Sequence, residues 1–535
     1  MGCRIAVASA LLVSHLAFCA APDIDSISPL ALRPGVPGEL KFSGNDLSEA
    51  TNVWASFPAK LESLGEGAFH ITPLASHPVG IGAVRLFGSN GVSPVALVML
   101  DDLPTASESS TNKTREAAQR VEFGSAIDAR CEELSYDWFK VRVNKGQRVA
   151  VEVVAMRLGS RLDSVLRVVN AAGRELARND DVPGLRADSF LTFTALDTGD
   201  YFVEVRDVNY GGGSEFFYHL RIGDFPLATA AFPVAAEQGS KHSFRLAGPS
   251  GDIGGMVATA TTNSAVVPLA IKGPVGSTFA AALTSATREI VEVEPNDTAK
   301  KATEVSLETG VNGRFDRAND RDCYEFSARK GDRMEFRAAT RSLGAPCDLL
   351  MQLESTDGQR LGRSNPSAAD EGVLTHAFAS NGVYRLIVEE AIGAFGPNMV
   401  YRIASRRAAG FALSLDTDTF NAAPGKDVDL KVTVTRGDYK GAVTLALDGL
   451  AGALVLTNNV IAEGKSNVTM KVTVPETFLP GTWTPFGVTG TAKRNGQEVR
   501  VRASTAPALR KRWQLMLYPL AEFDGVLALG VTAPK

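Results

Sequence analysis

The chain has 535 residues, enough for several domains at roughly 100–200 residues each. Apolar residues make up 44% of it, with 50 Gly and 26 Pro, which is the composition of folded domains and excludes a disordered chain. The 55 basic and 60 acidic residues give a net charge of −5 without a basic stripe, which excludes nucleic acid as the expected partner.

An export signal is predicted at the N-terminus. Arg4 precedes an apolar run over residues 5–18, and small residues follow it. This pattern is typical of a secretory signal peptide, assigned here to residues 1–21, although a buried first helix is an alternative. The run is too short for a membrane span, and no later segment is long and apolar enough for one. We therefore expect an exported protein of the periplasm, cell envelope or extracellular space, with no transmembrane segment.

Two stretches of the mature chain repeat one another. Residues 137–149 read DWFKVRVNKGQRV and residues 322–334 read DCYEFSARKGDRM, so Asp322 follows Asp137 by 185 positions. The same spacing joins Gly146 to Gly331. Further along it falls to 183, as a loop two residues shorter would produce, at Gly199/Gly382, Tyr201/Tyr384 and Tyr218/Tyr401. A repeat of this length indicates a duplicated domain, so Asp137 and Asp322 should be structurally equivalent, as should Gly146 and Gly331.

Apolar and polar residues alternate in short runs throughout both copies. Residues 149–154 and 201–206 are examples, and turns that contain Gly separate such runs. Period-two alternation predicts half-buried strands, and many short strands at this spacing predict a sandwich or jelly roll. No long helical pattern follows the signal peptide. The predicted fold class is therefore all-β, with tandem β-sandwich or jelly-roll domains.

The segments that precede the two copies also resemble each other, since each has a Pro near its start and then a strand that runs to a Gly about 15 residues on. The tail from about Gly410 alternates again and predicts a further immunoglobulin-like sandwich. The predicted order is thus A–B–A–B–tail. The predicted domains are residues 22–104, 105–223 (first copy), 224–289, 290–408 (second copy) and 409–535.

Both copies resemble the bacterial pre-peptidase C-terminal domain, the PPC domain. The residues that carry the resemblance in the second copy are Glu292, Glu294, Pro295, Asn296, Asp297, Asp322, Tyr324, Lys330, Gly331, Asp332, Gly382 and Tyr384. Those in the first copy are Asp137, Phe139, Lys145, Gly146, Asp163, Gly173, Asn179, Asp181, Gly199 and Tyr201. The two A segments resemble IPT/TIG-type immunoglobulin-like domains. PPC domains are jelly-roll sandwiches that accompany secreted proteases, so the resemblance implies an appendage or binding role.

A calcium site in the second copy is a further implication of the resemblance, since a similar domain in bacterial collagenases binds collagen and calcium. In such domains an acidic linker folds back onto a second acidic cluster. The matching positions are Glu292, Glu294, Asn296, Asp297, Asn319 and Asp322, with Tyr324 alongside. Calcium takes six to eight oxygen ligands, which these residues can supply. The alternative is an ordinary turn, which Pro, Asn and Asp all favour.

The first copy departs from this pattern. Lys113 stands at the position of Asp297, and Leu134 stands at the position of Asn319. A lysine and a leucine are not calcium ligands, so Ca²⁺ is expected in the second copy only. The acidic group Asn179, Asp180 and Asp181 is interpreted as a turn between strands.

Two smaller features leave alternatives open. Arg510, Lys511 and Arg512 next to Trp513 are interpreted as a solvated strand edge, with a contact to an anionic polymer as the alternative. Cys323 and Cys347 could form a disulfide, but the mature chain has an odd number of cysteines, so free thiols are the other possibility.

Motifs of common catalytic sites are missing. The sequence contains no His-Glu-x-x-His, no Gly-x-Ser-x-Gly and no phosphate-binding glycine loop. The chain is therefore expected not to be an enzyme. The predicted function is that of a secreted binding or scaffolding protein whose partner is an unidentified extracellular polymer or protein. The alternative is an accessory subunit of an exported, protease-associated hydrolase, or a diverged form of such a hydrolase.

Overall fold

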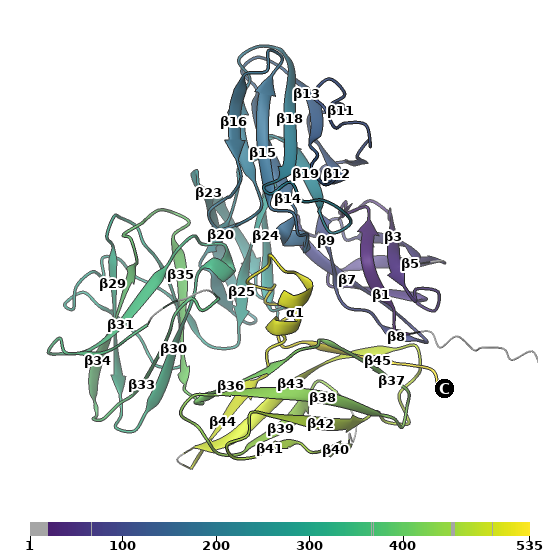
Figure 1. Cartoon of the computed structure of the whole chain (residues 1–535). Coiled ribbons are helices and arrows are strands. Elements are labelled where there is room, and N and C mark those ends of the chain that lie inside the picture. The colour runs from purple at the N-terminus through teal and green to yellow at the C-terminus, as the bar shows by residue number, and fades with distance from the viewer. Residues whose placement is uncertain are drawn as a thin grey trace, which may run out of the picture.

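The computed structural model describes residues 20–65, 67–364, 366, 369–450, 455–494 and 496–534. The predicted signal peptide lies outside these residues except for its last two positions. Strands make up 54% of the chain and helices 3%, so the predicted all-β fold class is confirmed. The strands form five pairs of sheets in chain order, and each pair is called a unit below (Figure 1).

The first unit pairs a sheet of order β1-β3-β6-β5 with a sheet of order β2-β9-β7-β4, in which β8 also pairs with β7. Its core includes Leu40, Phe69, Ile71 and Leu86. These residues lie on the faces of their strands that point between the two sheets. The strands are β1 (Asp23–Ser28), β2 (Ala31–Leu32), β3 (Gly38–Asn45), β4 (Asn52–Ala55), β5 (Ala59–Gly65), β6 (Ala68–Pro73), β7 (Gly80–Gly88), β8 (Gly91–Val92) and β9 (Ala96–Leu100).

The first copy is a sandwich of two five-stranded sheets, ordered β10-β12-β19-β14-β17 and β11-β13-β18-β15-β16. A short 3₁₀ turn, η1 (Met156–Leu158), follows β14. The strands are β10 (Thr105–Ser107), β11 (Gln119–Val121), β12 (Ser125–Arg130), β13 (Asp137–Val143), β14 (Arg148–Val154), β15 (Ser164–Asn170), β16 (Glu175–Asn179), β17 (Phe190–Thr194), β18 (Gly199–Asp207) and β19 (Phe217–Gly223).

The second copy repeats this topology strand for strand, with sheets β26-β28-β35-β30-β33 and β27-β29-β34-β31-β32. Its 3₁₀ turn, η2 (Arg341–Leu343), takes the place of η1. The strands are β26 (Glu289–Val291), β27 (Thr303–Glu304), β28 (Gly310–Arg314), β29 (Arg321–Ala328), β30 (Arg333–Ala339), β31 (Leu349–Ser355), β32 (Arg360–Arg363), β33 (Val373–Ala377), β34 (Gly382–Glu390) and β35 (Val400–Arg407).

The positions predicted to be equivalent are equivalent in the structure. Asp137 pairs with Val205 across β13 and β18, and Asp322 pairs with Val388 across β29 and β34. Gly146 and Gly331 have φ angles of +80° and +89° in the turns that follow β13 and β29. A left-handed backbone favours glycine, which explains why both copies carry one there. The duplication read from the sequence is therefore confirmed.

The third unit, between the copies, is small: two three-stranded sheets of order β20-β22-β23 and β21-β25-β24. The C-terminal unit pairs β36-β38-β42-β40 with β37-β45-β43-β39-β41, and β44 adds to β43. The strands of the two units are β20 (Ala230–Phe232), β21 (Ala235–Glu237), β22 (Lys241–Gly248), β23 (Gly251–Thr259), β24 (Val266–Lys272), β25 (Ser277–Ser285), β36 (Phe411–Leu415), β37 (Thr419–Ala422), β38 (Asp427–Arg436), β39 (Val443–Asp448), β40 (Val455–Thr457), β41 (Val460–Ile461), β42 (Asn467–Thr473), β43 (Trp483–Arg494), β44 (Gln497–Arg502) and β45 (Leu527–Val531).

The basic segment beside Trp513 is not a strand edge, so that interpretation is wrong. It forms the end of α1 (Ala506–Arg512), which lies near the middle of the molecule above the C-terminal sandwich (Figure 1). Leu509 and Trp513 are four residues apart and therefore share one helix face, which packs into the core of the first unit. Arg512 pairs with Asp418 at 3.0 Å. The apolar face therefore decides the placement of the segment, which its charges alone do not indicate.

Two other expectations are settled by local geometry. Asn179 ends β16, and its side-chain amide donates to the carbonyl oxygen of Asp181 at 2.8 Å, so the turn is confirmed. The three cysteines among the described residues, Cys131, Cys323 and Cys347, are buried free thiols. Cys323 and Cys347 therefore do not form a disulfide in this structure.

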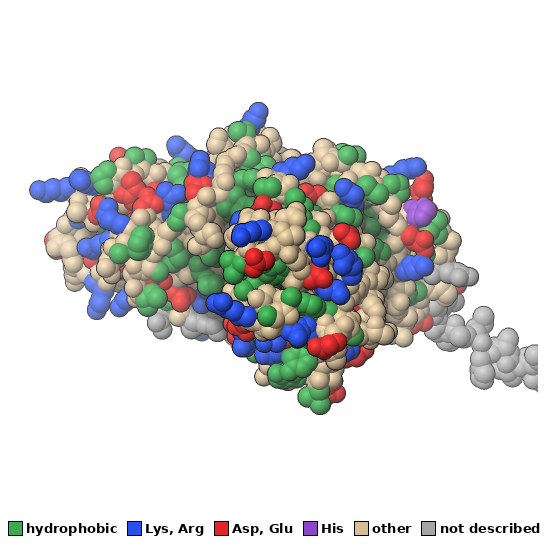
Figure 2. All heavy atoms as spheres, turned by 90° about the horizontal axis from the view of Figure 1, so that it is seen from above, with side chains coloured by type: hydrophobic (Ala, Val, Ile, Leu, Met, Phe, Trp, Pro, Cys, Tyr) green, Lys and Arg blue, Asp and Glu red, His purple; other side chains and the backbone are tan. Residues whose placement is uncertain are grey.

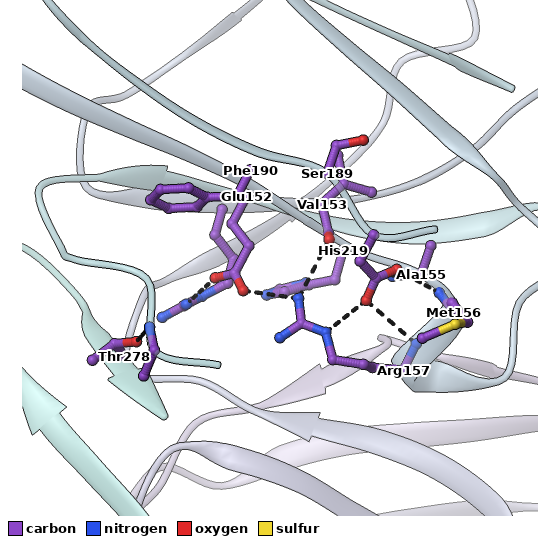
Figure 3. A network of polar contacts seen from close by, with 12 residues as sticks. Glu152, Val153, Ala155, Met156, Arg157, Ser189, Phe190, His219 and Thr278 are labelled. Atoms are coloured by element: carbon purple, nitrogen blue, oxygen red, sulfur yellow. Dashed lines mark hydrogen bonds and ion pairs between the residues drawn. The ribbon is translucent and has the colours of Figure 1, made fainter. Parts of the chain in front are cut away.

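Buried ion pairs and a hydrogen bond join the first unit, the first copy and the third unit. Figure 3 shows the part of this network around Glu152, Arg157 and His219. The fully buried Arg221 of β19 donates to Asp101 of the first unit at 3.0 Å and to Glu152 of its own copy at 2.5 Å. It also donates to the carbonyl oxygen of Ser277 in the third unit at 2.7 Å. Arg157 continues the network through Glu152 at 2.8 Å.

His219 belongs to the same network and lies between Asp101 and Asp128, at 2.9 and 2.6 Å. Burial lowers the pKa of His219, but its hydrogen bonds to the two aspartates outweigh burial and raise the pKa to about 9. The imidazole is therefore cationic at neutral pH and balances part of the buried negative charge.

Replacing Arg221 by Ala is expected to lower the free energy of unfolding by about 3–5 kcal/mol, because Asp101 and Glu152 would stay buried without their partner. Denaturant unfolding of the mature chain measures this change. The matched control is Arg245→Ala, which removes an exposed ion pair with Asp252 and should cost less than about 1 kcal/mol. Equal losses in the two variants would contradict a stabilising role for the network.

The two copies touch each other through glycine. Gly184 lies between β16 and β17 with a φ angle of +97°, and a Cβ atom there would be 2.2 Å from the carbonyl oxygen of Gly344, which follows η2. Backbone approach this close leaves no room for a side chain. The contact therefore fixes how the second copy sits against the first.

We expect Gly184→Ala to force the two copies apart and to destabilise the chain by more than the roughly 1–2 kcal/mol of left-handed strain alone. Gly146→Ala is the control, since Gly146 also has a left-handed φ but would place its Cβ in open space. Small-angle X-ray scattering should show a larger radius of gyration for Gly184→Ala only. Identical scattering of the two variants would mean that the copies do not depend on this contact.

Candidate metal centre

Three carboxylates that the sequence places in two separate clusters meet in the second copy. Glu292 and Glu294 follow β26, Asp322 lies on β29, and one carboxylate oxygen of each lies within 4.8 Å of the other two. Glu292 is held by the backbone, because its N–H donates to the carbonyl oxygen of Asn312 at 3.0 Å and its carboxylate accepts from the N–H of Arg314 at 2.6 Å. The linker therefore folds back onto the sandwich.

Two buried tyrosines line the group. The Tyr324 hydroxyl donates to Glu292 at 2.9 Å, and the Tyr401 hydroxyl donates to Asp322. The two hydroxyl oxygens are 2.6 Å apart. Tyr324 was predicted to lie alongside the site, but Tyr401 was missed. The sequence did contain a signal for Tyr401, because the repeat pairs it with Tyr218 of the first copy.

The electrostatics of the group are those of carboxylates that lack a counter-charge. Burial raises the pKa of Glu292 to about 8, and the negative charge of Glu294 adds to the effect. Burial likewise raises the pKa of Asp322 to about 9, with Glu292 as the next cause. The site therefore favours either protons or a cation.

Unpartnered oxygen atoms show that the group fits a hard cation. One oxygen of Glu294 and one of Asp322 are buried without a hydrogen-bond partner among the described residues. Asn296 is fully buried, and neither atom of its side-chain amide has a partner there. Buried polar atoms of this kind are rare without a ligand or water, and oxygen donors of this kind suit Ca²⁺.

The other predicted ligands lie differently. Asp297 lies against Arg317. Asn319 adopts a left-handed backbone with a φ angle of +56°, and its N–H donates to the carbonyl oxygen of Gly393 at 3.2 Å. Asp297 does not belong to the group of three converging carboxylates. The neighbouring Asp320 is buried and accepts from two backbone N–H groups.

The first copy holds an ammonium group at the equivalent place. The Lys113 Nζ lies 2.9 Å from Glu108 and 2.5 Å from Asp137, the repeat partners of Glu292 and Asp322. Burial lowers the pKa of Lys113, but its bonds to Asp137 and Glu108 outweigh this and raise the pKa well above its ordinary value. A permanent positive charge thus faces the carboxylates of the first copy.

The buried asparagine is common to both copies and does not distinguish them. Asn112, the repeat partner of Asn296, is also fully buried without a side-chain partner among the described residues. The carbonyl oxygen of Asn112 accepts from Trp138 N–H, as that of Asn296 accepts from Cys323 N–H. The copies therefore differ in their carboxylates, which are paired with lysine in the first and unpaired in the second.

Comparison with known proteins confirms the resemblance to PPC domains. Residues 135–207 match the family model of the bacterial pre-peptidase C-terminal domain, which places the match within the first copy. This match is consistent with an extracellular protein built of domains. No curated protein matches the chain.

Several solved structures align with parts of the chain at low similarity. The pre-peptidase C-terminal domain of collagenase from Bacillus anthracis is 14% identical, with 20% of this chain and 93% of that chain covered and a TM-score of 0.16. An ICAM-5 D1–D4 ectodomain fragment is 12% identical, with 89% and 96% covered and a TM-score of 0.12. The secreted serine protease VesC from Vibrio cholerae is 13% identical, with 36% and 47% covered and a TM-score of 0.12. At these TM-scores the alignments carry no argument about function.

Among the described residues, no helix has the length and apolar character needed to cross a membrane.

Proposed function

We propose that the chain is an exported, non-catalytic binding or scaffolding protein whose second copy is stabilised by Ca²⁺. The observation that carries the scaffolding role is the buried ion network around Arg221, which joins three units. Buried charges are costly unless their partners are in place, so such a network favours one arrangement of the units over others. A fixed arrangement suits a protein that presents several loops to a partner.

The partner is proposed to be an extracellular polymer or protein. Figure 2 shows acidic and basic side chains interspersed over the described part of one face, without a broad area of either sign. Such a surface favours a partner without a strong uniform charge. Nucleic acid is not an expected partner, because the described part of the face shown in Figure 2 has no broad basic area.

Calcium would be held by Glu292, Glu294, Asp322 and the amide oxygen of Asn296, with Tyr324 and Tyr401 orienting two of the carboxylates. When bound, the ion supplies positive charge that the described residues of this site lack. The role proposed for it is structural, because it would tie the linker after β26 to β29.

The non-catalytic role is tested by incubating the purified mature chain with a panel of peptide, ester and glycan substrates. No turnover is expected, whereas binding to glycan arrays or extracellular-matrix proteins is. Measurable turnover, lost on mutation of a residue in the chain, would instead favour the alternative of a diverged exported hydrolase. Co-purification with an exported hydrolase from the native source would favour an accessory subunit.

A further inference from the structure

A cavity of about 240 Å³ lies where all five units meet. The two 3₁₀ turns η1 and η2 both reach it, so the repeat-equivalent elements of the two copies share one cavity. Strands β24 and β25 of the third unit and the start of β7 of the first unit form further walls. The segment 516–522, which follows α1, forms its wall on the side of the C-terminal unit.

The walls are mostly apolar. They include Val79, Ile81, Met156, Leu185, Phe279, Leu283, Leu343, Met516 and Leu520. Small-molecule sites are typically concave, apolar and equipped with a few polar groups that orient the ligand. The volume is slightly below that of a site for a drug-sized molecule, which limits the ligand to a small one.

Glu522 is the one acidic side chain on the lining among the described residues. It is partly buried, and none of the hydrogen bonds and ion pairs found among the described residues involves its carboxyl group. Burial alone raises the pKa of Glu522 to about 7, and no neighbouring charge contributes. A carboxylate in this position is costly unless a cation or a hydrogen-bond donor reaches it.

The basic residues on the lining do not supply that cation. Arg157 is paired with Glu152 and Asp188, at 2.8 and 2.6 Å, and its guanidinium lies over the ring of Phe279 at 5.3 Å. Arg341 is paired with Asp348 at 3.0 Å. Arg186 is exposed and does not contribute to the pKa of Glu522.

We propose that this cavity binds a small amphiphile, with an apolar body packed between the units and a protonated amine paired with the carboxylate of Glu522. The apolar walls would contact the apolar body of the ligand, and the carboxylate of Glu522 would pair with its positive charge. Because the walls come from five units, the ligand would also hold the units together. This site is separate from the carboxylates of the second copy and does not depend on calcium.

The pH dependence of binding follows from the titratable groups on the lining. Burial lowers the pKa of His77, which favours its neutral form, and burial raises the pKa of Tyr518, which keeps its hydroxyl group protonated. Burial lowers the pKa of Arg157, but its ion pairs with Glu152 and Asp188 outweigh burial and raise the pKa, so Arg157 stays cationic. Ionisation of Glu522 between pH 6 and pH 8 adds a negative charge to the lining, so a cationic ligand should bind about tenfold more tightly at pH 8 than at pH 6.

The test is isothermal titration of the full mature chain with n-octylammonium and, separately, with octanoate, at pH 6 and pH 8. Saturable binding of octylammonium that strengthens about tenfold with pH is expected, with octanoate much weaker. Glu522→Gln should remove the pH dependence and most of the affinity. Glu463→Gln changes an exposed glutamate far from the lining and should leave binding unchanged.

A second variant, Ala281→Phe, fills the cavity from β25 and should abolish binding even if Glu522→Gln fails to fold. The proposal is overturned if octylammonium gives no saturable heat, if octanoate binds more tightly, or if Glu522→Gln binds octylammonium as the native chain does. Tighter octanoate binding would mean that the arginines on the lining select an anion.

Discussion

Addition of millimolar Ca²⁺ to the metal-free mature chain is expected to raise the unfolding temperature of the second copy by about ten degrees. Binding to the folded state alone stabilises by about 2.7 kcal/mol at a hundredfold excess over Kd, and for a domain of about 100 residues this corresponds to a shift of that order. The physical reason is that Glu292, Glu294 and Asp322 lie together without a balancing charge.

The same carboxylates should make the metal-free second copy sensitive to pH. The folded-state pKa values of Glu292 and Asp322, about 8 and about 9, lie above the ordinary values near 4 that apply to the unfolded chain. The folded state therefore binds more protons, and stability falls as pH rises from about 4 through 9. Calcium replaces those protons, so saturating Ca²⁺ should flatten the dependence.

Differential scanning calorimetry with Ca²⁺ and with chelator, at pH 5, 7 and 9, measures both effects. The double variant Glu294→Ala with Asp322→Ala should lose the calcium response. Glu308→Gln is the matched control, because it changes an exposed glutamate of the same copy and should respond as the native chain does. Equal unfolding temperatures of the native chain with calcium and with chelator would leave the acidic group as an ordinary turn.

The second large effect is expected at Lys113 of the first copy. Lys113→Ala removes the charge that lies between the partly buried Glu108 and the buried Asp137, and the loss should approach the roughly 3–5 kcal/mol of a broken buried pair. The pKa of Asp137 is already raised to about 6 by burial with the lysine present, so the variant should be least stable at high pH. Lys145→Ala, at an exposed turn of the same copy, is the control.

Lys113→Asp gives a sharper outcome because it also adds a carboxylate beside Glu108 and Asp137. The native first copy should be indifferent to calcium, since its own ammonium supplies the positive charge. The Lys113→Asp variant should be strongly destabilised in chelator and partly restored by millimolar Ca²⁺, as read from calorimetry. A native first copy that responds to calcium, or a variant as stable as the native chain in chelator, would contradict this assignment of charge.

The sequence by itself determined the strands and the duplication, and its resemblance to PPC domains predicted that the two acidic clusters meet. Alternation with period two reports which face of a strand is buried, and glycines such as Gly146 and Gly331 report turns with left-handed backbones. These signals are local, so they can be recognised without knowing which other parts of the chain pack against them. Glu292 and Asp322 could be paired because the resemblance to PPC domains supplied the long-range contact that periodicity lacks.

Only the tertiary structure decided the contacts between the units and the charge partners of Lys113 within the first copy. Leu509 and Trp513 pack into the core of the first unit, hundreds of residues away, and this contact makes a helix of a segment whose charges suggested a strand edge. Glu522 acquires its raised pKa in a cavity to which all five units contribute. The sequence indicates only that Lys113 is not a calcium ligand, whereas in the structure its ammonium group supplies the positive charge beside Glu108 and Asp137. The first two cases depend on side chains far away in the sequence, and the third depends on Asp137, which is 24 residues from Lys113, so no local pattern records them.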